Sequence, residues 1–409
     1  MMDGWKEIAL DKIGWFKGAG VNKLTNIDEK PVYLVNYMDV YKHWQIFFDE
    51  NYQQVTAKDR EIEEANLLKG DILFTPSSEK PIDIGHAGVV MENMSNCVYS
   101  YHLIRCRLFE KELFDLQFLS YLLNSDNVQK HFVSRASGSG IRYTLSLSDF
   151  KSAKIRFPEK AVQTTIATIL SKVDEAITAV QASIATAERL KKSLMQNLLT
   201  GRMKPDGTLR KEDEFYMDEK FGKVPKGWEV KRLGNLFNIK AGGDLQENYF
   251  SSIKDKQHNY PVFSNSLDNK GLYGYTSNPR FFANESITIT GRGGVGHPEY
   301  RQGPYDAIIR LISLIPLQSD AIDCRYISYY IGHYVHFALE STGVPQLTCP
   351  KVYATKIILP KNKHEQESIS KIIYKIDTVI EQKQQKIATL ERLKKSLMQN
   401  LLTGRVRVK

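Results

Sequence analysis

The stretch ERLKKSLMQNLLTGR occurs twice in this chain of 409 residues, at residues 188–202 and again at residues 391–405. The identity continues upstream to residues 184 and 387 with a single mismatch. Farther upstream the two copies diverge but keep apolar residues at many corresponding positions. A repeat of this length at a fixed distance indicates that the chain contains two copies of one structural unit.

Each copy lies in a predicted long helix. Apolar residues recur at alternating intervals of four and three, in the first copy at Ile166, Leu170, Val173, Ile177, Val180, Ile184, Ala187, Leu194 and Leu198. This spacing is typical of a coiled-coil seam, and about 40 residues at 1.5 Å each give a helix of roughly 60 Å. Because Lys191, Lys383 and Lys394 interrupt the seam, we expect part of each helix to meet another partner or solvent. Gly201 and Gly404 are expected to follow the helix ends.

A module of unlike sequence precedes each helix. Both modules begin with a Gly-Trp pair and continue with short runs rich in Val, Ile, Tyr and Phe, separated by Gly, Pro, Asn and Asp. Such runs predict small sheets joined by loops, with a helix at residues 113–132 and another near residues 323–339. The predicted boundaries are 1–158 for the first module, 159–202 for the central helix, 203–226 for a charged linker, 227–360 for the second module and 361–409 for the C-terminal helix.

The predicted fold class is α+β, with two pseudo-symmetric α/β modules separated by two long antiparallel helices that form a coiled coil. A chain order of module, helix, module, helix lets the two helices pack most simply in opposite directions about a pseudo-twofold axis. The helices are nearly identical while the modules differ, so we expect the helices to meet one kind of partner and the modules to meet different targets.

The composition bounds the class of protein. The 56 Lys and Arg residues exceed the 47 Asp and Glu residues, and the resulting net charge of +9 permits a polyanionic partner. The four cysteines are Cys97, Cys106, Cys324 and Cys349. They form no CxxC pair, so reduced thiols are expected. The longest apolar run, residues 307–317, contains Arg310 and Pro316 and is too short to span a bilayer. We therefore expect a cytoplasmic protein without a membrane partner.

The order of these segments resembles the specificity subunit of Type I restriction-modification systems. Two unlike domains, each opened by Gly-Trp and each followed by a near-identical helix ending in LLTGR, are similar to that family over essentially the whole chain. The sequence KGDILFTPSSEKPIDIGHAGVV at 69–90 is similar to the family's target-recognition domains. The segments YPVFSNS, GYTSNPRFF and ITITGRGGVG, at 260–266, 274–282 and 287–296, are similar to them in the second module.

The resemblance implies a non-catalytic subunit that reads a two-part sequence in double-stranded DNA, with one half-site for each recognition domain and a spacer set by the helices. It also implies two modification subunits, which bind S-adenosylmethionine and methylate adenine, and restriction subunits that join for cleavage. S-adenosylmethionine, ATP and Mg are accordingly expected on the partner subunits, and no cofactor is expected in this chain. The repeated helix ends are the expected docking surfaces, at Lys191, Lys192, Met195, Lys394, Lys395 and Met398.

Candidate DNA contacts follow from loop position and side-chain chemistry. Arg can bind guanine and Asn can bind adenine through two hydrogen bonds, while Lys and Ser more often hold phosphates. In the first module the candidates are Lys42, His43, Ser77, Ser78, Lys80, Arg135 and Arg142. In the second module they are Asn265, Lys270, Arg280 and Arg292.

Two other functions remain open from the residues alone. Asp206, Asp218 and Lys220 imitate the acidic pattern of a metal-dependent nuclease, although they lie in the charged linker. The chain could also be a coiled-coil scaffold without DNA contact. The run Gly291–Gly296 has the spacing GxGxxG, but His297-Pro298 follows it where a dinucleotide site needs a helix. The histidines form no metal-binding motif, so neither a catalytic residue nor a metal site is expected.

Overall fold

The computed structural model describes residues 4–18, 20–337 and 345–408. The chain forms two compact units. Unit 1 comprises Met1–Gln181 together with Gln385–Lys409, and unit 2 comprises Ala182–Gln384. Each unit therefore contains one module, the beginning of the helix that follows it and the end of the other helix. None of the helices in the described ranges is long and apolar enough to cross a membrane.

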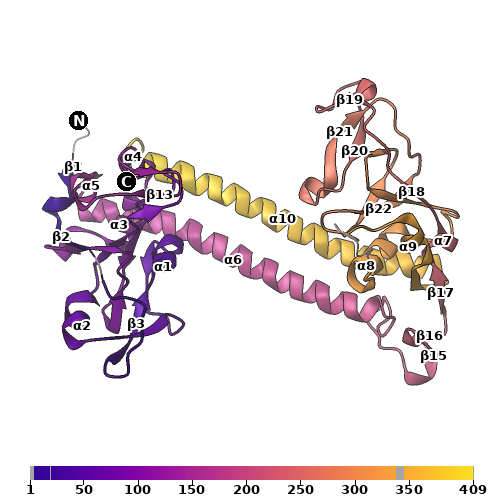
Figure 1. The fold of residues 1–409 in the computed structure, drawn as a ribbon, viewed down its shortest axis with the longest axis horizontal. Coiled ribbons are helices and arrows are strands. Elements are labelled where there is room, and N and C mark those ends of the chain that lie inside the picture. Colours follow the sequence, from indigo (N-terminus) through magenta and orange to yellow (C-terminus); the bar gives the residue numbers. More distant parts are fainter. Residues whose placement is uncertain (1–3, 19, 338–344, 409) are drawn as a thin grey trace. The chain divides into compact units, whose positions relative to one another are not determined.

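The two long helices are continuous (Figure 1). Helix α6 spans Lys160–Leu198 and helix α10 spans Lys363–Leu401, 39 residues each. Gly201 and Gly404 follow the helix ends with φ of 70° and 71°, a left-handed conformation in which glycine carries no steric penalty. The prediction of two equivalent long helices, each closed by a glycine, is confirmed.

The beginning of each helix packs on the end of the other. In unit 1, Ile166 and Leu170 near the start of α6 share a buried core with Leu401 near the end of α10. In unit 2, Ile369 near the start of α10 shares a buried core with Leu198 near the end of α6. Start-to-end contact in both units means that α6 and α10 pack together in opposite directions. Each buried leucine or isoleucine contributes roughly 1.5–3 kcal/mol.

The module of unit 1 is built from two main sheets and short helices. Its central sheet has the order β2-β11-β7-β9-β4, with β2 at Gly14–Gly18, β11 at Ile104–Leu108, β7 at Ile72–Phe74, β9 at Ala87–Val90 and β4 at Gln45–Ile46. A second sheet has the order β5-β3-β10-β6, with β5 at Gln53–Ala57, β3 at Lys30–Val35, β10 at Met94–Tyr99 and β6 at Asn66–Leu67. The small sheets are β1 (Lys6–Ala9) with β14 (Lys154–Phe157), and β12 (Ser137–Ser139) with β13 (Arg142–Thr144) and β8 (Ser77–Ser78). The helices are α1 (Tyr37–Lys42), α2 (Asp59–Ala65), α3 (Leu116–Leu123), α4 (Asp126–Val133) and α5 (Leu147–Ser152).

The module of unit 2 repeats the central sheet with one strand fewer among the described residues. The order is β18-β25-β22-β23, with β18 at Phe237–Ala241, β25 at Ile312–Pro316, β22 at Glu285–Ile289 and β23 at Pro298–Gln302. The second sheet is β19 (Phe250–Ser251), β21 (Leu272–Thr276), β20 (Tyr260–Phe263) and β24 (Asp306–Ala307). Two strand pairs join β15 (Phe215–Asp218) to β16 (Gly222–Pro225) and β17 (Trp228–Arg232) to β26 (Lys356–Pro360). The helices are α7 (Leu233–Leu236), α8 (Cys324–Tyr334) and α9 (Cys349–Ala354).

The smaller predicted elements are confirmed in part. The helix predicted at 113–132 is two helices, α3 and α4, because Asn124 and Ser125 interrupt it. The helix predicted near 323–339 ends at Tyr334, and the last two predicted positions lie outside the described residues. The charged linker at 203–226 carries the β15–β16 hairpin, so much of this segment is folded.

A charged contact locks the two helices together in each unit. In unit 1, Asp174 of α6 accepts a hydrogen bond from the Tyr121 hydroxyl at 2.7 Å and pairs with Lys394 of α10 at 2.7 Å. In unit 2, Asp377 of α10 accepts from a tyrosine of α8, Tyr329, at 2.6 Å and pairs with a lysine of α6 at 2.6 Å. We call each contact a lysine–aspartate–tyrosine lock.

The locks correct the prediction that the lysines of the seam turn to a partner or to solvent. Lys191 and Lys394 are only 29% and 20% exposed and face an aspartate of the opposite helix. A lysine at an apolar seam position needs such a counter-charge because burial of an unpaired ammonium is costly. The third interrupting lysine, Lys383, is half-buried.

Replacement of either lock aspartate should destabilise its own unit. Asp174→Asn and Asp377→Asn keep the shape of the side chain but leave the tyrosine and the lysine without a charged partner. We expect the midpoint of thermal unfolding to fall by roughly 2–4 °C for each lost kcal/mol. The control is Asp320→Asn, at an exposed aspartate. Equal midpoints for the lock variants and the control would contradict the role of the locks.

Candidate nucleic-acid interface

The loops that follow β7 and β22 leave the central sheets through the same set of hydrogen bonds. In unit 1 the Thr75 amide donates to the His86 carbonyl at 3.0 Å, and the His86 amide donates to Thr75 Oγ1 at 3.0 Å. In unit 2, Thr290 and His297 make the same two bonds at 3.1 Å and 2.9 Å. We call this arrangement the Thr–His clamp. It holds a longer loop in unit 1 and a shorter loop of unrelated sequence in unit 2.

The clamped loop of unit 1 brings four predicted DNA contacts to one surface. Ser77 and Ser78 form strand β8, which pairs with the hairpin strand that carries Arg142. Arg142 Nη2 donates to Ser77 Oγ at 2.9 Å. Lys80 is exposed in the same loop. These four side chains line an open hollow of about 720 Å³.

Two tyrosines that the sequence did not single out position this loop. The Tyr37 hydroxyl donates to the Ser77 carbonyl at 2.8 Å, and the Tyr41 hydroxyl donates to Asp83 at 3.0 Å. The other oxygen of Asp83 lies 2.8 Å from the ring nitrogen of His86. The hydrogen bond to the carboxylate raises the pKa of Tyr41, so its proton stays on the hydroxyl. Helix α1 thus holds the loop through the hydroxyl groups of these two tyrosines.

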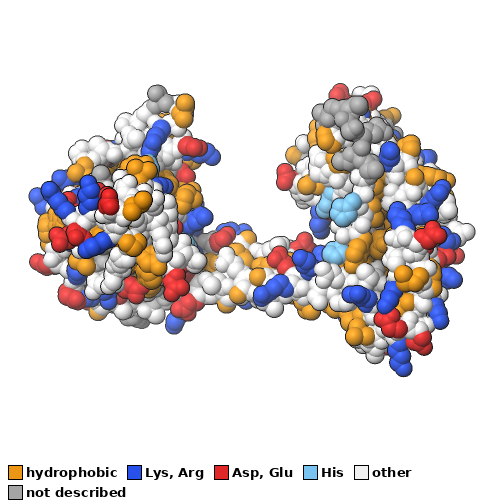
Figure 2. Space-filling model, turned by 60° about the horizontal axis from the view of Figure 1, so that its bottom comes forward, with side chains coloured by type: hydrophobic (Ala, Val, Ile, Leu, Met, Phe, Trp, Pro, Cys, Tyr) orange, Lys and Arg blue, Asp and Glu red, His pale blue; other side chains and the backbone are white. Residues whose placement is uncertain are grey.

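The hollow of unit 1 is lined by three cations, Lys23, Lys80 and Arg142, and by two carboxylates, Glu79 and Asp83. His102 lies in it, and burial together with the charges of Lys23 and Arg142 lowers the pKa of this histidine. Cations gathered at one surface favour a polyanion such as the DNA backbone. Charges are mixed on the molecular face in Figure 2 as well, where Lys and Arg are interspersed with Asp, Glu and hydrophobic side chains.

Three other predicted contacts in unit 1 do not line this hollow. Lys42 and His43 stand at the end of α1 and are exposed, while the face of that helix toward the hollow carries Tyr37, Met38 and Tyr41. Arg135 follows α4 and is also exposed; its guanidinium makes only long contacts, of 3.4 Å, with its own helix. The structure therefore does not bring these three residues together with the clamped loop.

Three chain segments meet at the clamped loop of unit 2. Asn265 Oδ1 accepts hydrogen bonds from the amides of Gly291 at 2.7 Å and Arg292 at 3.4 Å. Arg292 is exposed and donates to Gln346 Oε1 at 3.2 Å, and Arg310 donates to the same oxygen at 2.9 Å. Among the described residues, the other guanidinium donors of Arg292 have no hydrogen-bond partner. The Asn265 side chain thus holds the backbone of the clamped loop.

A buried arginine supports the loop that carries Lys270. Arg301 is 6% exposed, donates to the Lys270 carbonyl at 2.8 Å and to Thr288 Oγ1 at 2.8 Å, and lies 3.6 Å from the centre of the Phe263 ring. Burial lowers the pKa of Arg301 to about 10. Lys270 has a φ of 52°, so its backbone depends on this support, and its side chain is exposed.

Arg280 has an internal role. Its guanidinium binds both oxygens of buried Asp306, at 2.5 Å and 2.9 Å, and the carbonyl of Ala307 at 3.1 Å. A buried carboxylate needs this partner. The predicted DNA contact at Arg280 is exposed at the surface, but its guanidinium is held by Asp306.

The alternative motifs have other roles. Gly291–Gly296 leads into strand β23, and no helix follows to receive a pyrophosphate. Asp206 accepts from the side chain and amide of Thr208, and Asp218 accepts from the amides of Phe221 and Lys220. These bonds lower the pKa of both carboxyl groups and shape local turns. Within the part of the chain that the structure describes, no three His, Cys, Asp or Glu side chains are grouped to hold a metal ion.

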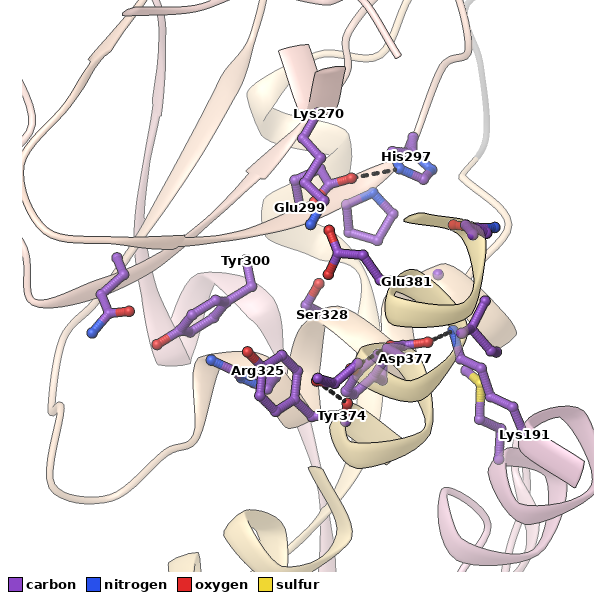
Figure 3. A pocket seen from close by; sticks show the side chains of 18 residues that line it. Lys191, Lys270, His297, Glu299, Tyr300, Arg325, Ser328, Tyr374, Asp377 and Glu381 are labelled. Atoms are coloured by element: carbon purple, nitrogen blue, oxygen red, sulfur yellow. Dashed lines mark hydrogen bonds and ion pairs between the residues drawn. The ribbon is translucent and has the colours of Figure 1, made fainter. Parts of the chain in front are cut away.

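The six predicted docking residues divide by exposure. Lys192 and Lys395 are exposed, Met195 is buried and Met398 is half-buried. Lys191 and Lys394 belong to the locks. Figure 3 shows Lys191 facing Asp377 at the edge of a hollow of about 680 Å³, which also takes in Lys270 and His297.

A family model described as Type I restriction modification DNA specificity domain matches residues 2–189 and 225–392. The chain belongs to this family. The two matches cover the two modules and most of both long helices. It is the non-catalytic DNA specificity subunit of a Type I restriction-modification system, as the resemblance predicted.

Relatives agree with this assignment. The chain is 28% identical over 367 residues to a protein described as the specificity subunit of the type I restriction enzyme MjaX of Methanocaldococcus jannaschii, covering 86% of this chain and 82% of that protein. It is 25% identical over 379 residues to the type I restriction enzyme MjaVIII specificity subunit of the same organism, covering 87% and 82%. The crystal structure of the Type-I restriction-modification system S subunit from M. genitalium has the same fold, with a TM-score of 0.59, 17% identity and coverage of 98% and 97%.

The Thr–His clamp is testable by removal of one acceptor. Thr75→Val and Thr290→Val delete the hydroxyl that accepts from the histidine amide, and an unsatisfied buried amide costs about 1–3 kcal/mol. We expect the amides of His86 or His297 to exchange with solvent roughly 5- to 150-fold faster, measured by hydrogen exchange. Thr75→Ser and Thr290→Ser keep the hydroxyl and should exchange at nearly the original rate. Unchanged exchange in the valine variants would show that the hydroxyl does not hold the loop.

Proposed function

We propose that this specificity subunit reads a two-part DNA sequence, with the clamped loop of unit 1 at one half-site and that of unit 2 at the other. The observation that carries the proposal is the pair of Thr–His clamps. The same backbone frame presents two loops that differ in length and in every exposed side chain. A shared frame with unlike loops is what two different half-sites require.

The chemistry of the loops suggests a division of tasks. Arg142 and Arg292 are exposed, and within the described part of the chain the guanidinium of each donates to one side-chain oxygen, which leaves donors for a base or phosphate. Arginine binds guanine through two parallel hydrogen bonds. Lys80 and Lys270 are exposed point charges suited to phosphates. Ser77 and Ser78 add hydroxyls that can bind either.

The long helices have two proposed roles. Their fixed length would set the number of unread base pairs between the half-sites. Their repeated ends would dock two modification subunits, which supply S-adenosylmethionine-dependent methylation of adenine, with restriction subunits joining for cleavage. Lys192 and Lys395 are the exposed members of the repeated docking set. Two copies of one surface support the binding of two copies of one partner.

The proposed function predicts that partners change DNA recognition. The chain should bind duplex DNA weakly alone, and the modification subunits of its own system should add specificity. The measurement is a filter-binding titration at fixed salt, followed by mapping of the methylated adenines. Binding that is indifferent to the modification subunits would contradict the docking role. Methylation at sites without a constant two-part sequence would contradict the reading role.

Single arginine substitutions should act on one half-site only. Arg142→Lys and Arg292→Lys keep the charge but lose the paired donors that recognise guanine. We expect a loss of discrimination of about 1–3 kcal/mol per base pair contacted, visible as relaxed sequence at the first half-site for Arg142→Lys and at the second for Arg292→Lys. Arg135→Lys, at an exposed arginine away from the hollow, is the matched control. Relaxation at both half-sites from one substitution would contradict the assignment of one half-site to each unit.

A further inference from the structure

The central sheets of the two units end differently at one edge. In unit 1, β4 closes the sheet by pairing in parallel with β9, and the Val89 and Met91 amides donate to the Trp44 and Ile46 carbonyls, both at 2.9 Å. In unit 2, β23 stands at the position of β9, and the described residues supply no strand on its outer side. The two strands align through their clamps, because His86 precedes β9 as His297 precedes β23.

The hydrogen-bonding groups along this open edge can be assigned. His297 and Gly303, which flank β23, make backbone bonds toward β22 and its preceding turn, at 3.1 Å and 3.0 Å. Alternation along an antiparallel strand then turns the amides of Tyr300 and Gln302 outward. They correspond to Val89 and Met91 of unit 1. Neither amide has a hydrogen-bond partner among the residues described.

The side chains that receive β4 in unit 1 have counterparts along the open edge in unit 2. The Trp44 ring packs edge-on against Tyr121 at 6.2 Å and lies 4.5 Å from Lys394 Nζ. Gln45 Nε2 lies 3.4 Å from Ser120 Oγ. The counterparts of the tyrosine, lysine and serine are Tyr329, Lys191 and Ser328, and with Tyr300 they line the hollow of about 680 Å³ in Figure 3.

One position shows how an occupant of unit 2 would differ from β4. Gly88 stands in unit 1 where Glu299 stands in unit 2, and a Cβ on Gly88 would lie 2.9 Å from the Ile46 side chain. In unit 2 the Glu299 side chain therefore starts on the side of the strand where Ile46 lies in unit 1, and its carboxylate lies 3.2 Å from His297 Nε2. Figure 3 shows Glu381 also directed into this hollow. A basic side chain in place of isoleucine would lie near these two carboxylates, in a hollow that Lys191, Lys270 and Arg325 also line.

We propose that the groove along β23 binds an extended segment of a partner subunit, which adds to the sheet as a fifth strand parallel to β23. Its backbone carbonyls accept from the Tyr300 and Gln302 amides. An aromatic side chain packs on Tyr329 beside Lys191, and a basic side chain two residues later pairs with Glu299. Strand addition of this kind draws affinity from the main chain and specificity from alternate side chains. The unit 1 groove is closed by its own strand, so each chain binds one such segment.

The probe is a labelled peptide of residues 42–48 carrying Ile46→Lys, titrated into the full chain and followed by fluorescence anisotropy. We expect saturable binding of one peptide per chain. A second substitution, Trp44→Ala, should weaken binding about tenfold, because ring packing and burial together are worth about 1.4 kcal/mol. The peptide with native Ile46 should also bind more weakly, since it places no cation beside Glu299 and Glu381. Equal binding of all three peptides, or no saturation at about 1 mM, would overturn the proposal.

A pair of substitutions in the chain separates the groove from other surfaces. Gln302→Pro removes the outward amide at an edge position that tolerates proline, and should weaken peptide binding at least tenfold. Gln302→Ala keeps the amide and should bind as the original chain does. Equal unfolding midpoints establish that both variants fold. Unchanged binding by Gln302→Pro would overturn the proposal.

Light scattering tests whether the groove binds a second copy of this chain, and DNA methylation tests whether the proposed function itself holds. A dimer of the chain that Gln302→Pro dissociates would assign the groove to β4 of a second copy and overturn the partner claim. Two-part DNA methylation by the assembled complex tests the proposed function separately, because it reports on DNA recognition and not on peptide binding. Failure of peptide binding with methylation intact would overturn this inference alone.

Discussion

Neither unit of this protein has a complete core without the helix end that comes from the other half of the chain. Leu401 and Leu402 are buried against the start of α6 in unit 1, and Leu198 and Leu199 are buried against the start of α10 in unit 2. This exchange explains why the repeated stretch is so closely preserved between the halves. The same apolar side chains must fit the same receiving surface twice, and the locks add one charged contact to each fit.

The modules are under a different constraint. Their central sheets share strand order, and the Thr–His clamp fixes the two points where the clamped loop leaves the sheet. Between those points Ile84 of unit 1 is buried in the core and Val295 of unit 2 packs against the core, whereas Lys80 and Arg292 are exposed and can vary without loss of core packing. Where a loop needs support it is provided locally, by Tyr37 and Tyr41 in unit 1 and by Asn265 and Arg301 in unit 2. The exposed side chains of each loop can thus differ while the packing of the core is kept.

The two central sheets are equivalent, but they differ at one edge. In unit 1 the chain between β3 and β5 forms strand β4, which covers the edge of the central sheet. In unit 2 no described residues form such a strand, so the outward amides of β23 lie uncovered beside the lock of that unit. An open edge strand is a ready template for another chain, and Pro298 at its start removes one donor from it. The edge therefore presents only the two amides of Tyr300 and Gln302, next to side chains from three elements.

The sequence by itself determined the two long helices, their opposite directions and the α+β modules. These follow from local periodicity and from an identical repeat, which need no knowledge of distant contacts. It also indicated the loops that carry Ser77, Lys80 and Arg292. Only the tertiary structure decided which polar side chains are free. Arg280 faces a buried aspartate, and Lys191 and Lys394 face the opposite helix, because residues far apart in the chain supply their counter-charges. Such pairings leave no local pattern for a sequence to reveal.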